Sequence, residues 1–154
     1  MQKITTFLWF DHEAEEAANF YVSIFKNSKM LDATRFRGPG GQERVTVVKF
    51  QLEGQQFIAL NGGPHFKFTE AISLFVNCAT QEEVDDLWEK LTAGGQESQC
   101  GWLKDRYGLS WQIVPAILTE LLADPDPARS HRAMQAMLQM KKIDIDVLKR
   151  AHAG

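Results

Sequence analysis

Residues 71–88 read AISLFVNCATQEEVDDLW, and residues 4–21 read ITTFLWFDHEAEEAANFY. Each stretch opens with an apolar run that is typical of a buried strand, followed by a turn, two adjacent glutamates and apolar residues at helical spacing. A shift of 67 residues without a gap carries residues 7–9 onto residues 74–76. The pattern therefore predicts an internal repeat that begins with a strand and a helix.

Three more strands are expected in each repeat. In the first repeat they fall at residues 30–37, 43–52 and 55–61, with turns at the glycine-rich tip 38–41 and at Glu53-Gly54. The fold class that follows is α+β, built from two βαβββ modules.

The second repeat has the same order of signals. A capping box starts the helix at Thr80 and Glu83, and strands are then expected at residues 96–100, 102–105 and 109–115. A second shift, of 54 residues, carries Gly54–Phe57 onto Gly108–Trp111, so the final hairpins repeat as well.

The tail predicts three helices, at residues 115–123, from Asp126-Pro127 onward, and at residues 143–151. We therefore divide the chain into a two-module domain and a C-terminal helical extension. The domain covers residues 1–115, with modules at 1–62 and 70–115, and the extension covers residues 116–154.

The composition is that of a soluble globular protein, with 154 residues of which 44% are hydrophobic and 24% charged. A net charge of −3 gives no electrostatic reason to expect nucleic acid or a membrane surface as a partner. The apolar runs are too short for a transmembrane helix, and the N-terminus has no export signal. We expect a cytoplasmic protein in which Cys78 and Cys100 are reduced thiols.

Three stretches carry a family resemblance. They are NGGPHFKFTEAISLFV at residues 61–76, CGWLKDRYGLSWQIVP at 100–115, and AMQAMLQMKKIDI at 133–145. They resemble the PhnB-like subgroup of the vicinal oxygen chelate superfamily, which includes glyoxalases, bleomycin-resistance proteins and extradiol dioxygenases. The subgroup often carries the label 3-demethylubiquinone-9 3-methyltransferase. The resemblance implies a glyoxalase-like fold for both modules.

The resemblance also implies a metal site, with one ligand from the first strand and one from the last strand of each module. Carried over position by position, the ligands fall on Thr6, Ile58, Ser73 and Gln112. This set offers none of the imidazole, thiolate or carboxylate groups that bind divalent first-row metals well. We therefore expect no bound metal and no cofactor.

Strand alternation predicts which side chains face a pocket. Thr6, Leu8 and Phe10 are expected on the open face of the first sheet, with Phe7 and Trp9 toward the helix. The open face of the second sheet is expected to carry Ser73, Phe75, Asn77, Ser110, Gln112 and Val114. An apolar wall with a few neutral hydrogen-bonding groups is typical of a small-molecule pocket, although such side chains also fill sheets and dimer interfaces.

The pocket candidates are Thr6, Leu8, Phe10, Ile58, Ser73, Phe75, Asn77 and Gln112. The secondary candidates are His65, Glu70, Cys100 and Trp102. We predict a PhnB-like protein that binds an unidentified small molecule without a metal, and the residues leave open whether it is an enzyme. Methyl transfer is not expected, because no G-x-G-x-x-G loop is present.

Two alternatives stay open. The first is a metal-dependent lyase, isomerase or dioxygenase of the same superfamily, with ligands from Gln112, Glu70 or His65. The second is a structural or interaction module whose cleft is closed by its own side chains.

A homodimer is expected for two reasons. Modules of this superfamily commonly pair, and the predicted helix in the tail carries an apolar stripe that must be buried. The stripe consists of Ala133, Met134, Met137 and Leu138.

Overall fold

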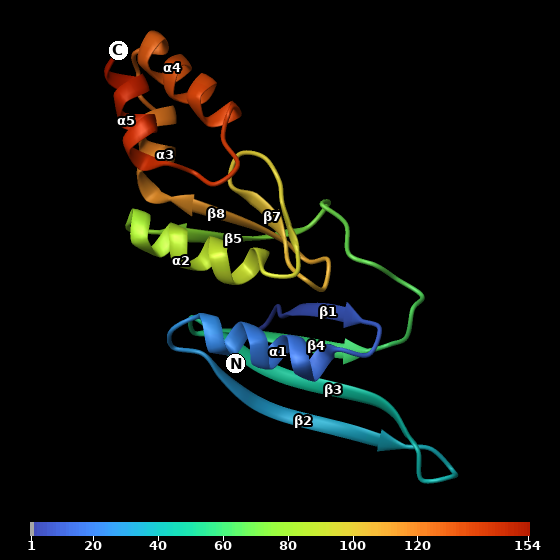
Figure 1. Ribbon diagram of the computed structural model, residues 1–154. Coiled ribbons are helices and arrows are strands. Elements are labelled where there is room, and N and C mark those ends of the chain that lie inside the picture. The colour runs from blue at the N-terminus through green and yellow to red at the C-terminus, as the bar shows by residue number, and fades with distance from the viewer. Residues whose placement is uncertain (1) are drawn as a thin grey trace. The chain divides into compact units, whose positions relative to one another are not determined.

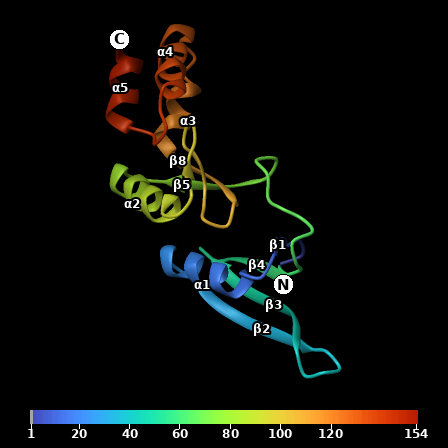
Figure 2. The same ribbon diagram turned by 45° about the vertical axis from the view of Figure 1, so that its right-hand side comes forward.

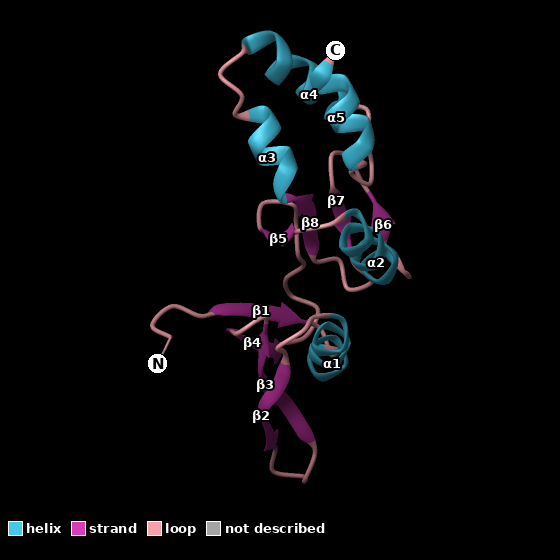
Figure 3. Ribbon diagram, turned by 90° about the vertical axis from the view of Figure 1, so that its left-hand side faces the viewer, coloured by secondary structure: helices cyan, strands magenta, loops and turns pink. Residues whose placement is uncertain are grey.

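The computed structural model describes residues 2–154, except for the side chains of residues 43–45, and it divides into two compact units (Figure 1). The first unit ends at Phe68 and the second begins at Thr69. Each unit contains one four-stranded sheet with a helix along one of its faces (Figure 3). The tail belongs to the second unit.

The first unit consists of β1 (Thr6–Phe10), α1 (Ala14–Ile24), β2 (Lys29–Arg37), β3 (Glu43–Leu52) and β4 (Gln55–Asn61). The sheet order is β1-β4-β3-β2, in which β1 and β4 are parallel and the other pairs are antiparallel. Glu53 and Gly54 have φ values of 49° and 83°, as a two-residue turn between β3 and β4 requires.

The second unit consists of β5 (Ser73–Cys78), α2 (Gln81–Thr92), β6 (Gln96–Glu97), β7 (Trp102–Lys104), β8 (Ser110–Pro115), α3 (Ala116–Leu122), α4 (Pro127–Leu138) and α5 (Ile145–Ala153). Its sheet order is β5-β8-β7-β6, with β5 parallel to β8. The predicted α+β fold with two βαβββ modules is therefore confirmed. No helix among the described residues is both long and apolar enough to cross a membrane.

The helix in each unit forms the core with one face of its sheet. In the first unit the ring of Tyr21 on α1 lies 6.3 Å from the ring of Phe50. Phe50 stacks in turn on Phe57 of β4, with 5.5 Å between the ring centroids. Burial of these large rings fixes the helix on that face.

The second core repeats this design. Thr80 caps α2 as predicted, because its side chain accepts a hydrogen bond of 3.2 Å from the N–H of Glu83. The buried residues of α2 are Val84, Leu87, Trp88 and Leu91. They share a core with Leu103, Trp111 and Ile113, which are at most 2% exposed.

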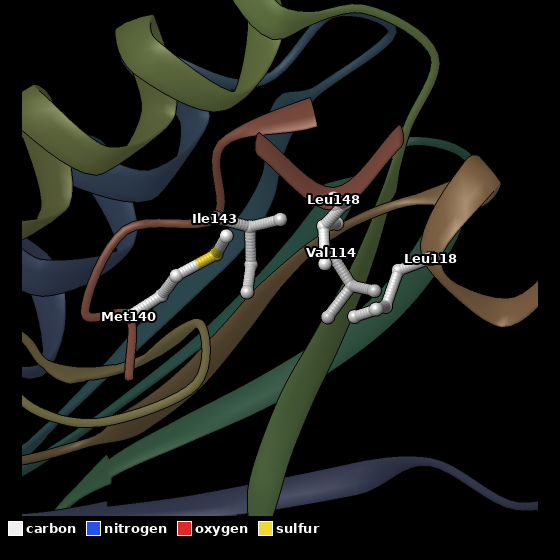
Figure 4. Close-up of a cluster of buried hydrophobic side chains, with 5 residues drawn as sticks. All are labelled: Val114, Leu118, Met140, Ile143 and Leu148. Carbon is white, nitrogen blue, oxygen red and sulfur yellow. The ribbon is translucent and has the colours of Figure 1, made fainter. Parts of the chain in front are cut away.

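The C-terminal extension packs against the second unit. In Figure 2, α4 and α5 lie side by side and α3 connects them to β8. Five buried residues form a hydrophobic cluster that joins the extension to the sheet (Figure 4): Val114, Leu118, Met140, Ile143 and Leu148. The extension therefore buries its own apolar side chains on this module.

Polar contacts hold the extension at two further points. The N–H groups of Cys100 and Gly101 each donate 2.8 Å hydrogen bonds, to the carbonyl oxygens of Met140 and Lys141 respectively. The side chain of Gln81, at the start of α2, donates to the Ile143 carbonyl at 3.0 Å and accepts from the Ile145 N–H at 2.8 Å.

The predicted open face of β1 is wrong. In the parallel ladder Leu8 lies beside Ala59, and both are buried, with exposed fractions of 4% and 0%. Residues beside each other in a ladder share a face, so Thr6, Leu8 and Phe10 lie on the face that α1 covers. Phe7, which is 52% exposed, lies beside Ile58 on the opposite face.

The cause of this error is one extra residue in a turn. Three residues connect β1 to α1, whereas two connect β5 to α2. The ladders place Thr6 beside Phe57 and Leu74 beside Trp111, so the strands correspond with a shift of 68 residues rather than 67. A shift that is wrong by one residue exchanges the two faces of a strand.

Candidate functional site

The open face of the second sheet carries a row of polar side chains. Ser110 of β8 lies between Ser73 of β5 and Lys104 of β7. Gln96 of β6 lies beside Lys104 at the end of the row. Side chains that are opposite each other on one face have Cβ atoms about 5 Å apart, so these four groups form one continuous polar strip.

The next row on the same face mixes aromatic and amide groups. Gln112 lies between Phe75 and Trp102. Its Nε2 atom donates a 2.9 Å hydrogen bond to the hydroxyl of Ser73 in the polar row. The expected common face of Ser73, Phe75 and Gln112 is therefore present, and the role of these residues in binding stays a prediction.

Beyond these rows the extension covers part of the open face. Val114, the third open-face residue of β8, is only 5% exposed because it belongs to the cluster in Figure 4. Asn77 lies beside Val114 in the ladder and remains exposed.

A hollow of about 240 Å³ opens at the β6–β7 side of this face. Its lining contains the secondary candidates Glu70 and Trp102 and, from the polar row, Lys104 and Ser110. The full lining is Glu70, Gln96, Glu97, Ser98, Trp102, Leu103, Lys104 and Ser110.

The charged groups of the hollow are already paired. Lys104 and Glu70 form an ion pair in which their side chains remain 37% and 60% exposed. The hydrogen bond from Lys104 holds the pKa of the Glu70 carboxyl below its usual range. Glu97 accepts a 2.8 Å hydrogen bond from the indole N–H of Trp88, on the helix side of the sheet.

The hydroxyl of Ser110 differs from the other polar groups of the hollow. Ser110 is 1% exposed, and its Oγ atom has no hydrogen-bond partner within the part of the chain that the structure describes. A buried polar group without a partner costs free energy, so such groups are rare in folded proteins.

Neither cysteine joins this arrangement. Burial raises the pKa of the Cys78 thiol to about 12, which leaves it protonated and unreactive at neutral pH. Cys100, a secondary candidate, has a φ of 57° and is tied to the extension through its N–H. Its side chain is not part of the lining of the hollow.

The first unit offers a different kind of surface. The residues beside each other on its open face are Phe7 with Ile58 and Trp9 with Leu60. The indole N–H of Trp9 donates a 3.0 Å hydrogen bond to the Gly63 carbonyl. Of the first-unit pocket candidates only Ile58 lies on this face.

The implied metal does not fit the residues present. The ligand positions carried over from the superfamily put Thr6 under α1 and Ile58 on the opposite face. The other two positions are Ser73 and Gln112, and the amide N–H of Gln112 donates a hydrogen bond to the hydroxyl of Ser73. Among the described residues, no three or more His, Cys, Asp or Glu side chains are grouped so that they could hold a metal ion. His65, offered as an alternative ligand, is exposed in the first unit.

Sequence reasoning missed Lys104, Gln96 and Ser98 as part of the hollow. The signal for Lys104 was available, because it alternates with Trp102 on β7 and so shares its face. The signal for Gln96 and Ser98 was weaker, since β6 has only two residues.

Comparison with known proteins places the chain in a family. The family model described as 3-demethylubiquinone-9 3-methyltransferase matches residues 2–114. A PhnB protein from Bacillus cereus is similar with 40% identity and a TM-score of 0.69, over 75% of this chain and 100% of that one. No curated protein matches the sequence.

Two less similar structures support the fold alone. A protein from Pseudomonas aeruginosa is 15% identical, with a TM-score of 0.61 over 75% of this chain and 98% of that one. A FosX fosfomycin resistance protein from Listeria monocytogenes, in complex with Mn(II) and dihydroxypropylphosphonic acid, is 16% identical. Its TM-score is 0.53, over 72% of this chain and 90% of that one.

The family model ends at Val114, so the expected resemblance of the tail gains no support from it. Up to that point the match, the identity with the Bacillus cereus protein and the two βαβββ modules agree. The chain belongs to the PhnB-like family described as 3-demethylubiquinone-9 3-methyltransferase.

Proposed function

We propose that this protein binds a small molecule without a metal ion, in the hollow on the open face of the second sheet. The observation that supports this most is the buried hydroxyl of Ser110, which has no partner among the described residues and lines the hollow. A ligand atom that hydrogen-bonds to this hydroxyl would remove the cost of its burial.

The size and lining of the hollow favour a small ligand. Its volume of about 240 Å³ lies below the range of about 300–1,000 Å³ that is usual for drug-sized ligands. Trp102 provides an apolar wall, while Lys104 and Ser110 provide polar groups. Six of the eight lining residues are polar or charged, which favours a ligand with several hydrogen-bonding groups.

Independence from metal is supported by the donor set. The FosX protein is described as a complex with Mn(II), whereas the open face of the second sheet carries hydroxyl, amide, indole and ammonium groups. Uncharged hydroxyl and amide groups are poor ligands for a first-row divalent metal.

Methyl transfer is not part of the proposal. The turns between strand and helix are residues 11–13 in the first unit and residues 79–80 in the second, and neither contains glycine. A dinucleotide-like cofactor needs a glycine-rich turn at this point, because the backbone must approach the ligand closely.

Two measurements test the proposal. Protein purified without chelators is analysed for zinc, nickel, manganese and iron, and we expect no stoichiometric metal ion. A thermal-shift screen over metabolites is expected to give ligands that raise the melting temperature.

The ligand must also act at the hollow. The stabilisation is expected to be lost in Trp102→Ala and kept in Trp9→Ala, the matched control in the first unit. Stoichiometric metal in the purified protein contradicts the metal-free part. A screen without any stabilising compound favours the module with a closed cleft instead.

A further inference from the structure

The anionic partner of Lys104 comes from outside the sheet. Lys104 is held on β7 and its neighbours in the polar row are strand residues, whereas Glu70 lies in the turn that precedes β5. The Glu70 side chain is 60% exposed, so water can solvate its carboxylate when it leaves the ammonium group. Glu70 therefore occupies a place that another carboxylate can take.

Ser110 offers a second donor at the same place. Lys104 and Ser110 are directly opposite each other in the antiparallel pair, which puts their Cβ atoms about 5 Å apart on one face. A carboxylate has two oxygens, so it can accept from the ammonium group with one and from the hydroxyl with the other. The Ser110 hydroxyl is buried and has no hydrogen-bond partner among the residues described, so a carboxylate oxygen at this place would satisfy it.

The aromatic wall defines the rest of the ligand. Trp102 lies two residues before Lys104 on β7, so its indole is on the same face and also lines the hollow. An apolar group attached to the carboxylate would contact this indole.

We infer that the hollow binds a small organic acid whose carboxylate replaces Glu70 on Lys104 and accepts a hydrogen bond from Ser110, with its apolar body against Trp102. This inference rests on the proposed function and specifies the chemical class of its ligand. A cationic ligand fits less well, because the Lys104 ammonium group is held on β7 in the lining of the hollow and repels a second positive charge. An organic acid places acceptor oxygens beside both donors, the Lys104 ammonium group and the Ser110 hydroxyl.

The test uses benzoate as the probe, with benzamide as the neutral analogue of the same shape. Binding is measured by titration calorimetry and by tryptophan fluorescence on the full chain. We expect benzoate to bind at least tenfold more tightly than benzamide, as for a charge-assisted hydrogen bond.

The variants separate the roles of the three residues. Lys104→Met is expected to remove the preference for benzoate, and Lys104→Arg to retain it, because arginine keeps the positive charge.

Ser110→Ala is expected to weaken benzoate binding by about tenfold. Glu70→Gln is expected to strengthen it, because the competing carboxylate is gone. Lys90→Met is the matched control, since Lys90 forms an exposed ion pair with Asp86 on α2.

The outcomes distinguish this inference from the proposed function. If benzamide binds as tightly as benzoate and Trp102→Ala weakens both, the hollow is a binding site but the ligand class is wrong. Absence of benzoate binding, or weaker or unchanged binding in Glu70→Gln, also overturns the inference. Melting curves of each variant show that the fold is intact, and Lys104→Arg provides the comparison if Lys104→Met does not fold.

Discussion

Asp105 is a buried carboxylate in the turn that joins β7 to β8 in the second sheet. It is 3% exposed and accepts hydrogen bonds from the N–H groups of Tyr107 (2.8 Å) and Leu109 (3.1 Å) and from the Trp111 indole (2.9 Å). These bonds close the turn between β7 and β8, which sets Lys104 opposite Ser110. The carboxylate therefore has a structural role beside the hollow.

Substitution of this carboxylate is expected to destabilise the fold. In Asp105→Ala the buried N–H groups of Leu109 and Trp111 and the partly buried N–H of Tyr107 lose their acceptor, and we expect the free energy of unfolding to fall by about 3 kcal/mol. Urea denaturation measures the change, with Asp86→Ala on the exposed side of α2 as the control. Equal effects of the two substitutions would show that the hydrogen bonds of Asp105 contribute nothing beyond a surface contact.

Gln112 lies beside Trp102 but outside the lining of the hollow, so it is expected to act in binding if the ligand extends past Trp102 along the open face. Its amide bonds to Ser73 in the open face, and Gln112→Ala removes a group that can also hydrogen-bond to a ligand. We expect ligand affinity to fall by about 1–3 kcal/mol with little change in the melting temperature. Gln135→Ala, on the exposed surface of α4, is the control. Unchanged affinity with a large loss of stability would make Gln112 a core residue.

The open face that carries the candidate site was predictable in the second unit, whereas the open face of the first unit was not. Alternation alone places Ser73 and Gln112 on one face, because β5 and β8 are buried against α2 on the other. Alternation on β1 gives two solutions, since Phe7 and Leu8 are equally apolar. Which of the two faces of β1 is covered depends on the length of the turn into α1. A comparison of the repeats without gaps cannot show that this turn is one residue longer than the turn into α2.

At the scale of elements, most of the fold follows from local signals. Thr80 caps α2 and Asp126 caps α4 as predicted, and the Glu53-Gly54 turn joins β3 to β4. These features depend on a few neighbouring residues, so the sequence contains them. The packing of the extension depends on contacts across many residues, such as the bond between Gln81 and Ile143, and has no local signal.

The attachment and the internal packing of the extension are expected to depend on pH, the first through Asp85 and the second through Asp124. The hydrogen bond from Gln81, with a further one from Lys142, holds the pKa of the Asp85 carboxyl below its usual range. The Asp124 carboxyl also has a lowered pKa, first through the N–H of Asp126 and then through His152. A carboxyl whose pKa is lowered in the folded state stabilises the protein when it is ionised. The full stabilisation is therefore present at pH values above the pKa of an aspartate in the unfolded chain, about 3.9.

Their contribution is therefore lost as the pH falls below about 4 through the folded pKa values. We expect the urea midpoint of the natural protein to fall more steeply below this pH than that of Asp85→Asn/Asp124→Asn. Denaturation at several pH values between about 2 and 6 measures both slopes. Parallel slopes would show that the two carboxyls do not link pH to stability.

At the scale of the whole molecule, the extension has become part of the second module. It buries Met140, Ile143 and Leu148 against Val114, and it holds the main chain at Cys100. The family model ends at this same Val114, so the extension lies outside the matched region. The extension covers the open face of β8 at Val114, which is 5% exposed.

The predicted apolar stripe on α4 is divided by this packing. Ala133 is fully buried and Met137 packs against the cluster, whereas Met134 and Leu138 remain 42% and 48% exposed. Met134 and Leu138 are one helical turn apart, so they form one exposed apolar patch. A flexible methionine beside a leucine suits contact with another protein surface.

The expected homodimer is proposed to use this patch. Light scattering of the full chain is expected to give about twice the 17.5 kDa of one chain. Met134→Lys/Leu138→Lys is expected to shift the equilibrium to monomer without a loss of melting temperature, because neither side chain belongs to the buried cluster.

Truncation after Leu122 is a poorer test, since it uncovers Val114 and removes the partner of the Cys100 N–H. A full-length monomer refutes the dimer, whereas a dimer that survives the double substitution refutes only the role of α4.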